Sequence, residues 1–289
     1  MNRGRATFFG FGAILLWALL AVLTVGSAPV PPFQLSAICF SLGGGLGLVF
    51  LIRSGKLKSI LSQTPLRVWA LGVGGLFGYH ALYFSALRLA PAAEAGLIAY
   101  LWPLLIVLFS GLLPGEKLRL GHIAGALLAF WGAGMLVLQG GGGFDAEALP
   151  GYGLALLCAL TWSGYSVLSR RAQAIPTETV ALFCLAAAGL SGLAHLGFEQ
   201  TYWPISPAQW LAILGLGAGP VGLAFYLWDF GVKRGDIQML GVASYAAPLL
   251  STFTLVAFGY AAATSTLIFA AALITAGAAI AAYASSRAS

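Results

Sequence analysis

The chain has 289 residues, of which 60% are hydrophobic and only 8% are charged, and its mean hydropathy is +0.94. A soluble domain carries roughly 25% charged residues, so this composition excludes an ordinary soluble protein and indicates one that lies in a lipid bilayer. The formal net charge is +6, but the basic residues stand singly or in short groups between apolar runs. That pattern is typical of membrane topology signals and excludes a nucleic-acid-binding surface. The three cysteines lie inside apolar runs without a CxxC or Cys/His pattern, so we expect no disulfide, no bound metal and no cofactor.

Ten segments are apolar and long enough, at about 20 residues each, to cross a bilayer as helices. Gly, Pro or charged residues separate them, as expected of helix boundaries. The predicted spans are 6–26, 32–52, 68–89, 91–113, 118–139, 151–169, 179–198, 208–232, 237–258 and 264–283. The first span follows Arg3 and Arg5 but exceeds the ~7–15 apolar residues of a signal peptide, so we interpret it as an uncleaved helix. The sequence therefore predicts an all-α integral membrane protein.

The positions of Lys and Arg predict the orientation of these helices. With the N-terminus in the cytoplasm, all but one of the 14 basic residues fall in cytoplasmic segments, and only Arg88 falls outside. The cytoplasmic ones are Arg3, Arg5, Arg53, Lys56, Lys58, Arg67, Lys117, Arg119, Arg170, Arg171, Lys233, Arg234 and Arg287. The positive-inside rule thus predicts that both termini are cytoplasmic.

The chain resembles itself at an offset of 145 residues, without a gap. The matches pair tryptophans, tyrosines and prolines, as in Trp17 with Trp162. Because the repeat contains five helices, an odd number, the second copy enters the membrane upside down relative to the first. We expect a first repeat at 1–140, an outer connector at 141–150 and a second, inverted repeat at 151–289. Such repeats place a binding site near the midplane and expose it alternately to each side, which predicts a transporter.

Ten helices in a five-plus-five duplication are similar to the drug/metabolite transporter superfamily, and specifically to its EamA-type members. The first half resembles the family in Ala86-Leu87 at the end of the third helix, Pro103 within the fourth and Gly115-Glu116 before the fifth. The resemblance covers nearly the whole chain. It implies a secondary transporter of a bacterial inner membrane that works by alternating access. The aromatic-rich core is most similar to that of the family's bacterial exporters of aromatic amino acids.

The third predicted helix supplies the first candidate substrate-binding residues. Tyr79, His80 and Tyr83 lie on one helical face. A charged histidine is costly in a bilayer, so His80 is either a neutral residue hydrogen-bonded within the bundle or one that lines a wet cavity. We favour the cavity because two tyrosines stand beside it.

Prolines in the middle of the fourth and ninth predicted helices indicate kinks. Pro103 and Pro248 each remove a backbone hydrogen bond, and the freed carbonyls are tolerated where they face protein or a water-filled cavity. We expect gating kinks beside the site, with a purely structural role as the alternative. The remaining substrate-binding candidates are Tyr100, Trp102, Trp162, Ser244 and Tyr245. Since Tyr100 and Trp102 are about 200° apart on an ideal helix, only one faces the cavity unless the kink reorients them; we favour Trp102, together with Tyr245.

No Asp, Glu, Lys or Arg lies at the predicted midplane, which disfavours cationic drugs and phosphorylated substrates. A neutral or zwitterionic, aromatic small molecule remains. We therefore predict a transporter, and not an enzyme, that exports aromatic or neutral amino acids and related metabolites, as a monomer or weak homodimer. A broad-specificity drug exporter is the alternative. An intramembrane hydrolase using Ser191 is a remote one, because His195 on the same helix has the wrong geometry to activate that serine.

Overall fold

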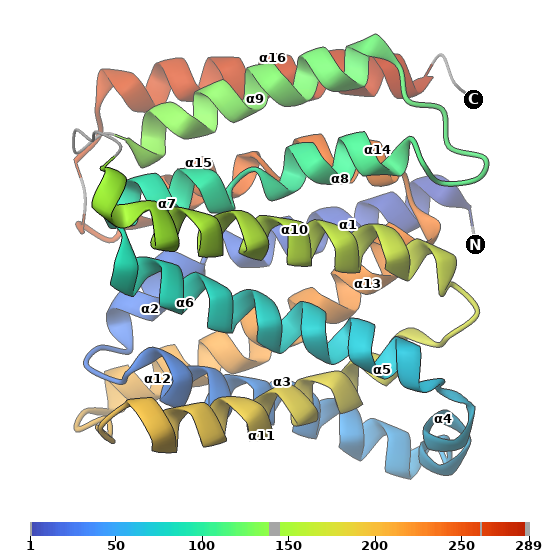
Figure 1. The fold of residues 1–289 in the computed structure, drawn as a ribbon, viewed down its shortest axis with the longest axis vertical. Coiled ribbons are helices and arrows are strands. Elements are labelled where there is room, and N and C mark those ends of the chain that lie inside the picture. The colour runs from blue at the N-terminus through green and yellow to red at the C-terminus, as the bar shows by residue number, and fades with distance from the viewer. Residues whose placement is uncertain (1, 139–144, 261, 287–289) are drawn as a thin grey trace.

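The structure, a computed structural model, describes residues 2–138, 145–260 and 262–286. Within these ranges it contains ten helical segments that are long and apolar enough to span a membrane. They lie side by side in one bundle (Figure 1). The predicted connector 141–150 lies partly outside the described residues, and Arg287 lies outside them altogether.

The five spans of the first half lie close to their predicted ranges, and three of them are composed of consecutive shorter helices. A further short helix, α4, follows the second span. The helices are α1 (Arg3–Trp17), α2 (Leu20–Gly26), α3 (Pro32–Arg53), α4 (Leu57–Gln63), α5 (Leu66–Val73), η1 (Gly74–Gly78), α6 (Tyr79–Leu89), α7 (Ala92–Ala99), α8 (Trp102–Ser110) and α9 (Leu120–Val137).

The five spans of the second half also follow the predicted ranges. Their helices are η2 (Ala146–Ala148), α10 (Leu149–Arg171), η3 (Thr177–Thr179), α11 (Val180–Phe198), α12 (Pro207–Ala218), η4 (Gly219–Leu223), α13 (Ala224–Arg234), α14 (Ile237–Ala243), α15 (Ala246–Ala257) and α16 (Ser265–Ser286). Helix starts carry local signals: Ser206 and Gln209 form a capping box at α12, and the Asp236 side chain accepts a hydrogen bond from the backbone of Met239 at α14.

The two halves interrupt their helices at matching places. The π-helical turns η1 and η4 lie 145 residues apart, one in the third span and one in the eighth. The fourth span breaks after Ala99 and the ninth after Ala243, each a few residues before its proline. Such interruptions of an α-helix are frequent at functional sites. The halves differ at the first span, which breaks after Trp17, whereas α10 runs on unbroken.

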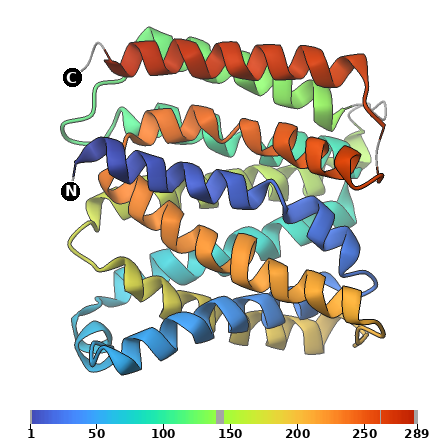
Figure 2. The same ribbon diagram turned by 180° about the vertical axis from the view of Figure 1, so that it is seen from behind.

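The main packing partner of most spans comes from the other half. The most extensive contacts join α9 with α16, α3 with α11, α1 with α13 and α6 with α10. Figures 1 and 2 show α9 and α16 lying together along one edge of the bundle. Glycine permits the closest approaches: a Cβ at Gly43 would lie 2.6 Å from the Cα of Gly222. Small residues of this kind let membrane helices pack backbone to backbone.

Both termini lie on one side of the bundle, so we refer to that side as the inner face, following the predicted orientation, and to the opposite side as the outer face (Figures 1 and 2). Helix α1 runs from the inner to the outer face, and α10, which begins the second half, runs the other way. This is the arrangement that an inverted repeat requires.

Candidate functional site

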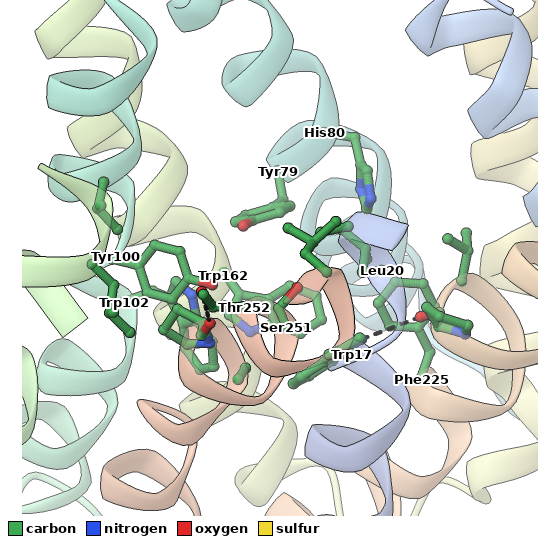
Figure 3. Close-up of a pocket in the computed structure, with 18 residues that line it drawn as sticks. Trp17, Leu20, Tyr79, His80, Tyr100, Trp102, Trp162, Phe225, Ser251 and Thr252 are labelled. Atoms are coloured by element: carbon green, nitrogen blue, oxygen red, sulfur yellow. Dashed lines mark hydrogen bonds between the residues drawn. The ribbon is translucent and has the colours of Figure 1, made fainter. Parts of the chain in front are cut away.

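A cavity of about 330 Å³ lies in the middle of the bundle, lined by residues from seven of the ten spans and from both halves. Figure 3 shows aromatic side chains converging on it from several helices. Of the residues proposed from sequence, the ones that line it are Tyr79, His80, Tyr100, Trp102, Trp162 and Pro248.

Trp17, Trp102 and Trp162 line this cavity at its inner end, and Trp228 packs against all three. We call these four residues the tryptophan cluster. Every pair among them is in ring contact, with centroids 5.1 to 6.3 Å apart. Two of them are also tied to the bundle by hydrogen bonds: the Trp17 indole donates to the Pro220 carbonyl at 3.2 Å, and the Trp228 indole donates to the Ser166 hydroxyl at 3.0 Å. The cluster is therefore a rigid apolar floor.

His80 is held by the π-helical turn that precedes it. Its Nδ1 lies 2.7 Å from the carbonyl of Leu76 in η1. A carbonyl can only accept, so Nδ1 carries the proton, and in the neutral ring Nε2 is left as an acceptor. The ring packs edge-on against Phe40 and Phe225, which fixes its orientation. His80 thus combines the two alternatives from the sequence, because it is hydrogen-bonded within the bundle and also lines the cavity.

Tyr100 and Trp102 both line the cavity, although an ideal helix would direct them apart. The reason is the break between α7 and α8: Tyr100 and Leu101 form the turn that separates the two helices. The break changes the direction in which the side chains leave the backbone. The arrangement is therefore the exception allowed for in the sequence analysis, in which the kink reorients these side chains and both face the cavity.

Four predicted residues are placed elsewhere. Tyr245, which the sequence favoured, is fully buried beside Phe130, and its hydroxyl accepts a hydrogen bond from the backbone N–H of Leu104. It satisfies a donor in the first turn of α8 that has no partner within its helix. Ser244 is also fully buried and donates to the carbonyl of Leu240. Pro103 is buried in α8 and is not a lining residue. Tyr83 does not line the cavity either, and its ring stacks on that of the lining residue Tyr79.

Sequence reasoning missed a polar stripe on α15. Pro248, Ser251, Thr252 and Leu255 all line the cavity, and their spacing puts them on one face of the helix. The Thr252 hydroxyl donates to the Pro248 carbonyl at 2.8 Å, beside the position where the proline removes a backbone bond (Figure 3). The signal was available: two hydroxyl residues follow the kink within one turn.

The lining carries no Asp, Glu, Lys or Arg within the part of the chain that the structure describes. Its polar groups are the imidazole, the hydroxyls of Tyr79 and Tyr100, and those of Ser251 and Thr252. These groups donate and accept hydrogen bonds without a fixed charge. Such a cavity suits an uncharged or zwitterionic molecule that has an aromatic ring.

On the inner side of the floor, a group of charged residues joins the two halves; we call Arg3, Glu116, Arg170 and Asp236 the inner ion cluster. Glu116, whose side chain is 5% exposed, accepts from Arg170 through one oxygen and from Arg3, at 2.9 Å, through the other. Arg170 also donates to the carbonyls of Val232 and Gly235 at the end of α13. This cluster ties the loop before α9 to α1, α10 and α13, so the bundle is closed toward the inner face.

Toward the outer face the cavity is continued by residues near helix ends. Leu20 and Ala21 in α2, Leu136 and Val137 at the end of α9, and Leu255 in α15 line it. All of these lie in the outer parts of their spans. The cavity therefore extends from the tryptophan cluster toward the outer face, the side opposite the two termini.

Comparison with known proteins identifies relatives over the whole chain. Residues 4–138 and 149–283 each match the model of the EamA-like transporter family. The sequence is 56% identical over 285 residues to the aromatic amino acid exporter YddG of Ancylobacter novellus, covering 97% of this chain and 98% of that one. It is 27% identical to the protein of the same name in Escherichia coli, over 87% and 88% of the two chains.

A solved crystal structure has the same fold. Its chain is 55% identical in sequence and superposes with a TM-score of 0.92 over 97% of this chain and 98% of its own length. These matches agree with the ten helices that could span a membrane and with the cavity between the two halves. The chain is therefore a multi-pass membrane protein that belongs to the EamA-like transporter family.

Proposed function

We propose that this protein exports aromatic amino acids across a bacterial inner membrane, by alternating access of the central cavity to the two faces. One observation carries the proposal: an aromatic cavity, whose described lining holds no charged side chain, is closed toward the inner face and open toward the outer one. Its volume of about 330 Å³ is near the low end of the roughly 300–1,000 Å³ of small-molecule sites. A single small metabolite fits such a space better than a drug-sized one.

The lining residues suggest how a zwitterionic aromatic amino acid is held. Its ring would lie against Trp162 and Trp102, in the edge-on or stacked arrangements that aromatic rings prefer and that Trp162 already makes with Trp102 and Trp228. The ammonium group would donate to Nε2 of His80, and the carboxylate would accept from the hydroxyls of Tyr79 or Ser251. None of these contacts requires a charged side chain. The hydrogen bonds to His80 and to the hydroxyls would offset the cost of taking the ammonium and carboxylate groups out of water.

Alternating access requires that the closed inner side opens while the outer side closes. The breaks at Tyr100–Leu101 and Ser244–Tyr245 divide the fourth and ninth spans at equivalent depths. Rocking about these breaks would part the inner ion cluster and bring α15 toward the tryptophan cluster. We propose that Pro103 and Pro248 keep these breaks in place, and that the protein works as a monomer or weak homodimer.

The two alternatives have less support. A drug exporter that binds cations needs an acidic side chain in the cavity, and the described lining has none. For a hydrolase, the Ser191 hydroxyl would have to meet a histidine. Ser191 is fully buried outside the cavity, and the two ring nitrogens of His195 contact Glu199 and Thr201. We therefore propose that the protein is not an enzyme.

Uptake into proteoliposomes tests the proposed function. Radiolabelled phenylalanine, tryptophan and a cationic dye are each offered with and without a proton gradient, which also decides whether transport is coupled to protons. We expect saturable flux of the two amino acids and none of the dye. Dye flux without amino-acid flux would contradict the proposal.

A matched pair of tryptophan variants connects the flux to the cavity. Trp102→Ala removes a floor residue that is 6% exposed, and Trp131→Ala removes one on α9 that is 70% exposed. We expect the first variant to lose amino-acid flux and the second to keep it. Equal flux in the two variants would remove the central cavity from the proposal.

A further inference from the structure

A second cavity, of about 640 Å³, lies at the inner face, between α1, α14, α16 and the loop before α9. It shares no lining residue with the central cavity. Fully buried side chains, among them those of Leu240, Ile106 and Trp228, lie in the core between the two. In this conformation both cavities are therefore present at once, one on each side of the closed core.

The charged groups of this second cavity balance. Arg3 and Lys117 are its basic residues, and Glu116 and Asp236 are its acidic ones. Arg3 reaches both acids through the same nitrogen, Nη2, at 2.9 Å from Glu116 and 3.7 Å from Asp236. The second distance is too long for a hydrogen bond, so this oxygen of Asp236 remains a good acceptor for an ammonium group. The other nitrogens of the Arg3 fork have the geometry to hold a carboxylate.

Gln238 supplies a further donor. The side chain is 2% exposed and lines the cavity, and its Nε2 is buried without a hydrogen-bond partner among the described residues. Leaving a buried amide donor unpaired costs about 1–3 kcal/mol, and such groups are rare in folded proteins. A carboxylate bound next to Gln238 would satisfy it.

Apolar side chains form the rest of this lining. Phe8 and Phe11 enter it from α1 and Met239 from α14. Aromatic rings and a methionine thioether together accommodate a flat apolar group well. The cavity thus presents a donor pair, an acceptor and an apolar wall beside one another.

We propose that this inner cavity is a second binding site, which takes a zwitterionic amino acid with an aromatic side chain before it enters the central pathway. The carboxylate binds Arg3 and Gln238, the ammonium group binds Asp236, and the ring lies against Phe8 and Phe11. The proposal rests on the proposed function, because it assumes the same substrate. Two basic and two acidic residues in the lining favour a ligand that carries both charges over a phosphate or another simple anion.

The site would also influence the inner closure. Arg3 belongs both to this cavity and to the inner ion cluster. A carboxylate that attracts Arg3 competes with Glu116 for the same guanidinium. Loading from the inner side would therefore weaken one of the contacts that keep the inner face closed.

Counting bound substrate tests the inference. Tritiated phenylalanine is equilibrated with the purified full-length protein in nanodiscs of phosphatidylcholine, and the amount bound per chain at saturation is measured. We expect two molecules per chain in the unchanged protein, one in Gln238→Leu and one in Trp162→Ala. Ala282→Leu, which fills the inner cavity without removing a polar group, should also bind one.

Gln34→Leu is the matched control, since Gln34 is 4% exposed, has an equally unpartnered Nε2 and lies near the outer face in α3. It should still bind two molecules. A single molecule in the unchanged protein, lost in Trp162→Ala, would overturn the inner site and leave the proposed function standing. No binding at all would overturn the proposed function itself. Loss of the second molecule in nanodiscs that contain phosphatidylglycerol would instead assign the cavity to an anionic lipid headgroup.

Discussion

The two halves of the molecule share a backbone plan but use it differently. The π-helical turns and the helix breaks recur 145 residues apart, yet the side chains at those places do not match. His80 in the first half faces Phe225 in the second, and Tyr100 lines the cavity whereas Tyr245 is buried. A duplicated backbone thus provides hinges on both sides, while the binding surface is free to be asymmetric.

The same contrast appears just after the breaks. Ser251 and Thr252 of α15 line the open cavity, and their counterparts Ile106 and Val107 of α8 are fully buried. The equivalent helices α15 and α8 therefore have opposite roles in this conformation. Helix α15 lines the central cavity at these positions, whereas α8 is packed in the closed core on the inner side. In the inward-facing state proposed above, the two would exchange these roles.

The largest effect that we expect concerns this exchange. Thr252→Cys should react with a membrane-impermeant maleimide from the outer face, and Val107→Cys on the order of 100-fold more slowly, if local opening costs about 3 kcal/mol. The three native cysteines are buried, so we expect them to react little with the maleimide. Substrate added at the inner face should speed up the labelling of Val107→Cys from that side. Equal rates at the two positions would contradict the asymmetry.

A second prediction compares how tightly the two π-helical turns, η1 and η4, are packed. A Cβ at Gly222 would collide with the carbonyl of Gly217 and lie 3.1 Å from the Cα of Gly43, whereas one at Gly74 would meet nothing within 4 Å. We expect Gly222→Ala to lower the free energy of unfolding by about 3 kcal/mol, the upper end of overpacking costs. Gly74→Ala should leave it nearly unchanged. Thermal unfolding in one detergent measures both, and similar midpoints would refute the packing argument.

A third prediction makes the halves alike at one position. His80→Phe gives the third span the residue that the eighth span has at Phe225 and removes the Nε2 acceptor. Losing one hydrogen bond to the substrate, about 1.4 kcal/mol, should raise KM for phenylalanine roughly tenfold. Phe225→Leu, which removes a ring but no polar group, is the comparison and should change KM less. An unchanged KM in His80→Phe would mean that this nitrogen does not touch the substrate.

The smallest effects are expected at the two tyrosines. Tyr245→Phe leaves the Leu104 N–H without its partner and should cost about 1 kcal/mol of stability with little change in KM. Tyr100→Phe removes a hydroxyl from the cavity lining and should do the reverse. Unfolding midpoints and transport kinetics on both variants measure this crossed pattern. If both variants changed the same quantity, the assignment of the two tyrosines to different roles would be wrong.

The helices were predictable because each span is a continuous apolar run, and the charges between the runs predict their orientation. The form of the π-helical turns was not predictable. Gly74–Gly78 and Gly219–Leu223 contain glycines, and the second also contains Pro220, which indicates a weak point in a helix but not a π-helical turn. Trp102 lines the cavity as we favoured, but the break at Tyr100–Leu101 also brings Tyr100 into the lining, where an ideal helix would not have placed it. A proline in a sequence announces a kink but not the direction in which the neighbouring side chains then point.

Long-range partners were likewise beyond the sequence. Nothing local distinguishes Tyr245, which meets the backbone of Leu104, from Tyr100, which faces the cavity. Arg88, the basic residue predicted to lie on the outer side, pairs with Glu199, whose carboxylate also accepts from the backbone N–H groups of Phe33 and Gln34. Such pairs form between residues that are far apart in the chain, and only the packed bundle brings them together.

The interleaved packing of the two halves has a consequence for biogenesis. Helices α1, α3, α6 and α9 have their main partners in α13, α11, α10 and α16, which leave the ribosome later. Until then the early helices must reside in the lipid without those partners, each stable as a separate span. The first two spans, with mean hydropathies of 2.4 and 2.2, are better suited to this than the third, which contains α6 and has a mean hydropathy of 1.2. Assembly of this protein is thus a late event, completed only when the last helix, α16, inserts beside α9.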